Sequence, residues 1–124
     1  MVKEIVTNSG HKLLVDDEDS IHLLYREELE EEGYQVFSAM NGGKALEIFG
    51  SNPIDLVILD INMPGMDGIE VLRQLKAQKP SLPVILSTAY SEYKHDLGSW
   101  ASDDYIVKSS SLDELKTSIR KRLG

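Results

Sequence analysis

Short apolar runs alternate along this chain with segments of helical spacing, and this alternation restricts its fold more than any other feature. Four runs are continuously apolar and each is too short for a helix: residues 13–15, 56–59, 84–86 and 105–107. A less uniform fifth candidate, residues 34–39, follows Gly33, which predicts the end of a helix. Continuous apolar strands are typical of a parallel sheet that is covered on both faces.

Between these runs, apolar residues recur every three or four positions, as they do on one face of a helix. The predicted stripes are Ile21, Leu24, Tyr25 and Leu29; Ala45, Ile48 and Phe49; Ile69, Leu72 and Leu75; and Leu112, Leu115, Ile119 and Leu123. Ser111 with Glu114 predicts a capping box before the last helix, and we expect a short or irregular helix over residues 91–102. This order of elements predicts an α/β fold whose parallel sheet carries helices on both faces.

Composition narrows the class of protein. A length of 124 residues fits one domain, which we expect over residues 11–123, with residues 1–10 as an N-terminal tail or an extra strand. The 13 basic and 21 acidic residues give a net charge of −8, which disfavours direct binding of nucleic acid or anionic membranes. The chain has no cysteine, and neither a signal peptide nor a membrane span is predicted, so we expect a cytoplasmic protein.

Polar side chains gather at the predicted carboxyl ends of the strands. They are Asp16 and Asp17 after the first strand, Asp60 after the third, Ser87 and Thr88 after the fourth and Lys108 after the fifth. Each has a structural explanation when it is taken singly, such as a helix cap or a solvated charge. Their joint placement favours a site, because ligands of open α/β sheets bind beyond this edge. Three clustered carboxylates repel one another unless a cation lies among them, and their hard oxygens suit Mg²⁺.

Four motifs occur in a fixed order. They are VDDED from Val15, LDINMPGMDGIEVL from Leu59, STA from Ser87 and DDYIVK from Asp103. Together they resemble the receiver domain of bacterial two-component response regulators, over about residues 11–123. The resemblance implies a flavodoxin-like, doubly wound sheet of five parallel strands in the order 2-1-3-4-5, with helices on both faces.

The resemblance also implies a phosphoacceptor site. Asp60 would take a phosphoryl group from a partner histidine kinase or phosphotransfer protein, and Lys108 would contact the phosphate. Asp16, Asp17 and Asp60 would hold Mg²⁺ together with the backbone carbonyl of Asn62. Such a domain catalyses only its own phosphorylation and dephosphorylation, so we do not expect an enzyme with separate substrate turnover.

In the family, Thr88 and Tyr105 would form a switch. The phosphorylated Asp60 would accept a hydrogen bond from the Thr88 hydroxyl, and Tyr105 would turn into the space that is vacated. The face made by residues 91–102, the fifth strand and the last helix would then change for contact with a downstream protein or effector domain. A phosphorylation-dependent dimer is compatible with this mechanism.

Three other functions share parts of this pattern. A flavin-binding electron carrier of the same architecture would place a phosphate next to residues 16–19, all of which are acidic. An aspartate-nucleophile phosphohydrolase normally carries a cap or a larger core. The principal alternative is a degenerate receiver that acts only as a protein-binding module, and the intact set of Asp16, Asp17, Asp60, Thr88 and Lys108 argues against it.

Overall fold

The structure is a computed structural model that describes residues 10–60, 68–88, 104–107 and 112–123. Its elements are β1 (His11–Val15), α2 (Asp19–Glu31), β2 (Gln35–Ala39), α3 (Gly42–Ser51), β3 (Leu56–Leu59), α4 (Gly68–Gln78), β4 (Val84–Thr88), β5 (Asp104–Val107) and α6 (Asp113–Leu123). The strands pair in parallel in the order β2-β1-β3-β4-β5. The helix expected over residues 91–102, the cap at Ser111 and all of residues 1–10 except Gly10 lie outside the described residues.

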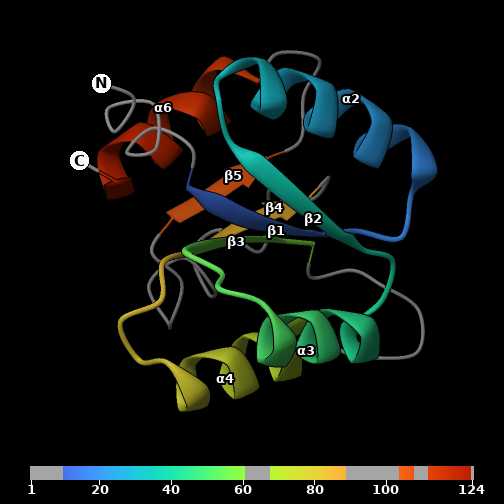
Figure 1. Cartoon of the computed structure of the whole chain (residues 1–124), viewed down its shortest axis with the longest axis vertical. Helices are drawn as coiled ribbons and strands as arrows, with labels where there is room; N and C mark the ends of the chain where they lie inside the picture. Colours follow the sequence, from blue (N-terminus) through green and yellow to red (C-terminus); the bar gives the residue numbers. More distant parts are fainter. Residues whose placement is uncertain (1–9, 61–67, 89–103, 108–111, 124) are drawn as a thin grey trace.

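Helices cover both faces of the sheet: α2 and α6 lie on one side, and α3 and α4 lie on the other (Figure 1). Consecutive strand residues therefore enter opposite cores, so that Leu13 packs in the cluster with Leu72 of α4, and Leu14 packs in the cluster with Leu29 of α2. All four residues of β3 are buried. The parallel α/β fold predicted from the continuous apolar runs is thus confirmed.

The buried face of α2 differs from the predicted stripe. Tyr25 and Leu29 are buried as expected, but Leu24 is 40% exposed, and His22 is buried instead, with 7% of its surface exposed. With about 3.6 residues per turn, His22, Tyr25 and Leu29 lie on one face of the helix, whereas Leu24 points away from the sheet. The predicted core position of Leu24 is therefore wrong.

Polar groups set the ends of two neighbouring elements. Gly33 follows α2 with a φ of 98°, in the left-handed region that favours glycine, and the predicted helix stop is confirmed. Asn41 caps α3, because its Oδ1 accepts a hydrogen bond of 2.8 Å from the Lys44 backbone N–H. These two residues fix the bounds of the segment that contains β2.

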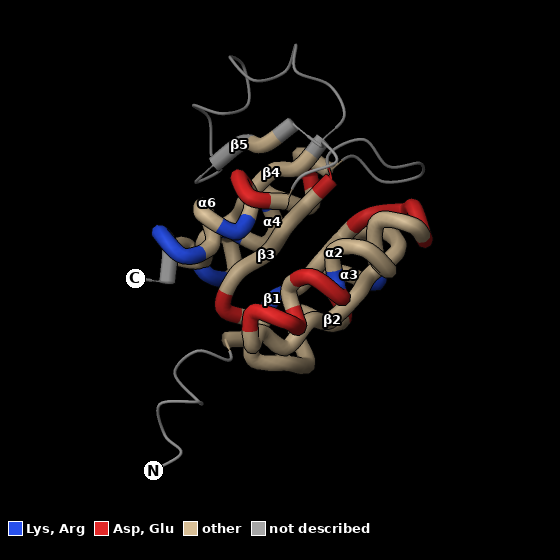
Figure 2. The backbone as a smooth tube through the Cα atoms, turned by 90° about the horizontal axis from the view of Figure 1, so that it is seen from above, with Lys and Arg blue, Asp and Glu red and all other residues tan. Residues whose placement is uncertain are grey.

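Ion pairs join α2 to α6 on their shared side of the sheet. Lys116 Nζ lies 2.7 Å from Oε1 of Glu28 in α2, and Arg120 Nη2 lies 3.1 Å from Oε1 of Glu32, the residue that follows α2. The hydrogen bond to Glu28 raises the pKa of Lys116. Figure 2 shows acidic residues along α2 and at the ends of β1 and β3, with basic residues toward the C-terminal end of α6. Opposite charges on the two helices thus stabilise their packing.

A buried lysine lies near the start of β1, away from the carboxyl ends of the strands. The Lys12 side chain is fully buried, its Nζ lies 4.6 Å from the centroid of the Tyr34 ring, and this Nζ has no hydrogen-bond partner among the described residues. Burial lowers the pKa of Lys12 to about 8, although the nearby Asp55 carboxylate opposes this shift.

In the described part of the chain, no helix has the length and apolar character to cross a membrane.

Candidate functional site

Three aspartates meet where β1 and β3 end. Asp16 and Asp17 follow β1, Asp60 follows β3, and the parallel pairing of Val15 with Leu59 brings the two strand ends side by side. One carboxylate oxygen from each aspartate lies within 4.8 Å of the other two. Asp16 and Asp60 are only 2% and 4% exposed. The structure therefore brings together the three carboxylates that the sequence analysis expected at this edge, and we call them the aspartate cluster.

The backbone around the aspartate cluster is held by the sheet. The Asp16 N–H donates to the Ala39 carbonyl at 3.1 Å, and the Asp60 N–H donates to the Val15 carbonyl at 2.9 Å. Asp16 Oδ1 accepts a hydrogen bond of 3.0 Å from the Glu18 N–H, which closes the turn into α2. Both buried aspartates thus extend the hydrogen-bond ladder of β1 and its neighbours, which limits where their side chains can lie.

His22 also belongs to this region, and the sequence analysis missed it. Its Nε2 lies 2.7 Å from the backbone carbonyl oxygen of Asp16. Because a carbonyl oxygen only accepts, Nε2 carries the proton of this hydrogen bond. The signal that could have revealed His22 is its spacing from Tyr25 and Leu29, which puts a polar residue on the buried face of α2.

The donor set of the aspartate cluster fits a hard divalent cation. Its three groups are carboxylates, and Mg²⁺ prefers oxygen ligands and is commonly held by one or two carboxylates plus waters. Carboxylates at this separation also repel one another, and a cation between them removes that repulsion.

Of four other expected site residues, the described part of the chain contains the backbone of two. Thr88 is the last residue of β4, which lies beside β3, and Tyr105 lies in β5, where it pairs with Leu86. The backbone thus puts Thr88 at the same edge of the sheet as Asp60, but the side chains of Thr88 and Tyr105 lie outside the described part of the chain. Asn62 and Lys108 lie outside it entirely.

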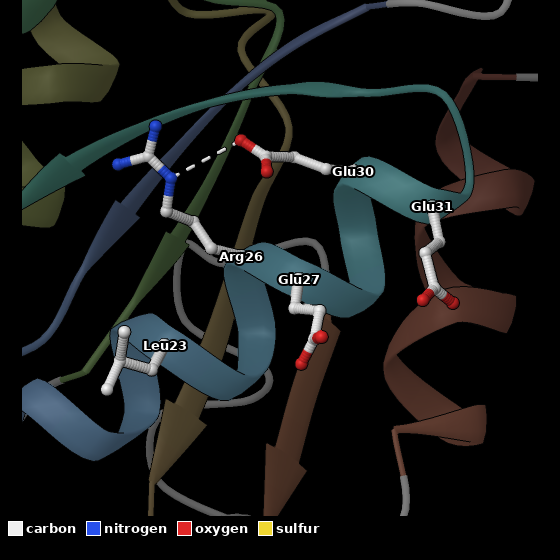
Figure 3. Close-up of a pocket in the computed structure, with 5 residues that line it drawn as sticks. All are labelled: Leu23, Arg26, Glu27, Glu30 and Glu31. Atoms are coloured by element: carbon white, nitrogen blue, oxygen red, sulfur yellow. Dashed lines mark hydrogen bonds and ion pairs between the residues drawn. The ribbon is translucent and has the colours of Figure 1, made fainter.

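A shallow hollow lies on the outer surface of α2. It is lined by Leu23, Arg26, Glu27, Glu30 and Glu31 (Figure 3). Leu23 is 74% exposed, and Arg26 forms an ion pair of 3.3 Å with Glu30. In Figure 3 the carboxylates of Glu27 and Glu31 point to the same side, away from Arg26. The hollow therefore combines an exposed apolar side chain with acidic groups.

The family model of the response regulator receiver domain matches residues 13–120. The chain belongs to this family. The resemblance carried by the four sequence motifs is therefore confirmed.

Two solved structures with 50% sequence identity are similar to this receiver domain over nearly its whole length. One is the response regulator protein TrrA from Thermotoga maritima in complex with Mg²⁺-BeF; the match has a TM-score of 0.86 and covers 91% of this chain and 98% of that one. The other is TrrA in complex with the histidine kinase ThkA, with a TM-score of 0.86 and coverage of 93% and 99%.

Curated relatives of this receiver domain differ in length. Sporulation initiation phosphotransferase F of Bacillus subtilis is 39% identical over 116 residues, which cover 90% of this chain and 91% of that protein. The regulatory protein AtoC of Escherichia coli is 35% identical over 90% of this chain, but the match spans only 24% of AtoC. The transcriptional regulatory protein ResD of Bacillus subtilis is 40% identical, and the match spans 49% of it. The receiver domain therefore spans about half or less of several relatives.

Proposed function

We propose that this receiver domain accepts a phosphoryl group on Asp60 from a histidine kinase or phosphotransfer protein and signals by protein contact. The observation that carries the proposal is the meeting of three carboxylates within 4.8 Å at the ends of β1 and β3. The likeness to TrrA, which was solved with Mg²⁺-BeF and with the kinase ThkA, supports it.

Asp60 is the proposed nucleophile because of its place in the sheet. It follows the central strand β3, between β1, which carries Asp16 and Asp17, and β4, which ends in Thr88. An oxygen of the Asp60 carboxylate attacks phosphorus, the bond between phosphorus and the kinase histidine nitrogen breaks, and the imidazole leaves with the electron pair. The product is an acyl phosphate on Asp60.

We assign Asp16, Asp17, Asp60 and the Asn62 carbonyl as the groups that would hold Mg²⁺. The buried carboxylates of Asp16 and Asp60 present oxygen donors from a backbone that the sheet fixes, which favours a preformed site. When bound, Mg²⁺ would supply positive charge next to the phosphoryl oxygens and reduce the repulsion between two anions.

Lys108, Thr88 and Tyr105 complete the proposal. Lys108 supplies a second positive charge to the phosphoryl group, and the Thr88 hydroxyl donates a hydrogen bond to it. Tyr105 then turns, and the face formed by residues 91–102, β5 and α6 changes for a downstream protein or effector domain. The support for these roles is the order of strands, which puts β4 next to β3 and β5 next to β4.

The kinase is proposed to approach over α2. This helix begins two residues after Asp17, so its exposed Leu23 and Leu24 lie close to the edge where the phosphoryl group must be delivered. Exposed leucines next to a reaction site favour contact with an apolar partner surface.

Phosphorylation by acetyl phosphate and Mg²⁺, followed by intact-protein mass spectrometry, tests the proposal. We expect one phosphoryl group on the wild type and none on Asp60→Asn. The matched control is Asp55→Asn, since Asp55 is an exposed aspartate at the opposite end of β3; it should be labelled like the wild type. Equal labelling of Asp60→Asn would refute the assignment. A wild type that takes no phosphoryl group, even from a kinase, would favour the alternative of a binding module.

A further inference from the structure

The imidazole of His22 is a buried polar group that the phosphoacceptor chemistry does not use. His22 is 7% exposed and lies on the face of α2 that packs against the sheet. Its Nδ1 is buried and has no hydrogen-bond partner among the described residues, so the interaction of Nε2 with the Asp16 carbonyl is the polar contact that the structure gives this ring. Burying the Nδ1 atom without a hydrogen-bond partner costs free energy of folding. A buried histidine at this position therefore calls for an explanation, and its one polar contact is the place to look for it.

The contact joins a rigid helix to a residue of the aspartate cluster. His22 lies in the first turns of α2, where its backbone N–H donates a hydrogen bond to the Glu18 backbone carbonyl. The Asp16 N–H is held by Ala39, its Oδ1 by the Glu18 N–H, and its carbonyl by His22. Of these three contacts, the first two are made by backbone groups and the third by a side chain, that of His22.

We propose that His22 is a positioning residue for the metal site. By donating Nε2–H to the Asp16 carbonyl, it orients the peptide unit that follows Asp16, and thereby holds the Asp16 and Asp17 carboxylates where their oxygens can converge with that of Asp60. The inference rests on the proposed function, because the site that it positions is the one assigned to Mg²⁺. His22 lies outside the acidic motif, and its hydrogen bond would contribute to the affinity of the site for Mg²⁺.

Two substitutions separate positioning from packing. His22→Gln keeps an amide N–H that can reach the carbonyl, whereas His22→Leu fills the buried volume without a donor. Leu29→Val is the matched control, because Leu29 is fully buried on the same helix, two turns away from His22. Its truncation lowers the stability of the domain but leaves the Nε2–H donor of His22 in place. If His22→Leu does not fold, His22→Phe provides a planar ring without a donor for the same comparison.

The experiment is a Mg²⁺ titration of the unphosphorylated ¹⁵N-labelled protein, followed by NMR at the amides of residues 16–18. We expect the Mg²⁺ concentration for half-saturation to rise by about 3- to 10-fold in His22→Leu, the range of one net hydrogen bond. His22→Gln and Leu29→Val should stay close to the wild type. Long-range ¹H–¹⁵N spectra of the wild type should show a protonated Nε2 and a bare Nδ1.

Other results would overturn the inference. Equal half-saturation in all variants would mean that His22 does not position the site, and equal losses in His22→Gln and His22→Leu would mean that only packing matters. A neutral ring protonated on Nδ1 would remove the donor. Because the titration uses unphosphorylated protein, it is independent of phosphoryl transfer. Mg²⁺ binding that depends on His22, in a protein that neither acetyl phosphate nor a kinase labels, would refute the proposed function alone. Labelling without any effect of His22→Leu on half-saturation would refute the inference alone.

Discussion

Replacing Lys12 with methionine should stabilise the domain. Lys12 is fully buried, and its Nζ has the Tyr34 ring as a neighbour but no hydrogen-bond acceptor among the described residues. Methionine has a similar length and no charge, so Lys12→Met removes the cost of burying an ammonium group while it keeps the apolar contacts of the stem.

The magnitude follows from the pKa of Lys12, which burial lowers from 10.5 to about 8. At about 1.4 kcal/mol per pKa unit, burial of the charged form costs about 3 kcal/mol at pH 7. We therefore expect Lys12→Met to raise the free energy of unfolding by up to about 3 kcal/mol at pH 7.

The sign of the pH dependence is opposite to that of a stabilising ion pair. Between the folded pKa of about 8 and the unfolded value of 10.5, lysine binds a proton in the unfolded chain but not in the native protein. The stability of the wild type relative to Lys12→Met therefore rises with pH in this range, and the gap between the two proteins should shrink by about 2 kcal/mol from pH 7 to pH 9.5. Burial raises the pKa of Tyr34, so measurements stop below the pH at which tyrosine ionises.

Urea unfolding at pH 7 and pH 9.5 measures both effects. The control is Lys44→Met, because Lys44 is exposed and the difference between this variant and the wild type should not change with pH in the same way. A Lys12→Met protein that is less stable than the wild type at pH 7, or a gap that does not change between the two pH values, would refute the reasoning.

Three further outcomes are expected. Mg²⁺ at ten times its Kd should raise the free energy of unfolding by about 1.4 kcal/mol in a thermal-shift assay, and the gain should disappear in Asp17→Ala; an equal gain in both would contradict the assigned site. Gly33→Ala should lose about 1–2 kcal/mol in urea unfolding, because its φ of 98° strains an L residue, and an unchanged midpoint would contradict this. Leu23→Ser should lower phosphoryl transfer from a histidine kinase about tenfold relative to labelling by acetyl phosphate, whereas equal effects on both would argue against docking on α2.

Hydropathy predicted which segments form strands better than where the strands end. The apolar run at residues 13–15 lies within β1, which begins at His11, because parallel pairing continues through the charged Lys12. The extent of a strand follows its hydrogen-bond ladder, which polar residues can also join. In β3 the run and the strand coincide, since this central strand is buried along its whole length.

The aspartate cluster could be predicted because it depends on topology. Residues that follow parallel strands meet at one edge, so the positions of Asp16 and Asp60 in the sequence were sufficient. The spacing of His22 from Tyr25 and Leu29 puts it on the buried face of α2, but an apolar pattern does not predict that its side chain bonds to the backbone carbonyl of Asp16. The same pattern misplaced Leu24, because a leucine that would be expected in the core is exposed while a histidine is buried. The ligand role of Asn62 and the phosphate contact of Lys108 stay predictions.

Helix α2 contacts both the turn that follows β1 and the last helix, α6. Near its start, His22 is bonded to the Asp16 carbonyl, and in its last turns Glu28 is paired with Lys116 of α6. At about 1.5 Å of rise per residue, these contacts lie roughly 9 Å apart along the helix. Through these two contacts α2 connects the turn after β1, next to the aspartate cluster, directly to the last helix, without involving β4 or β5.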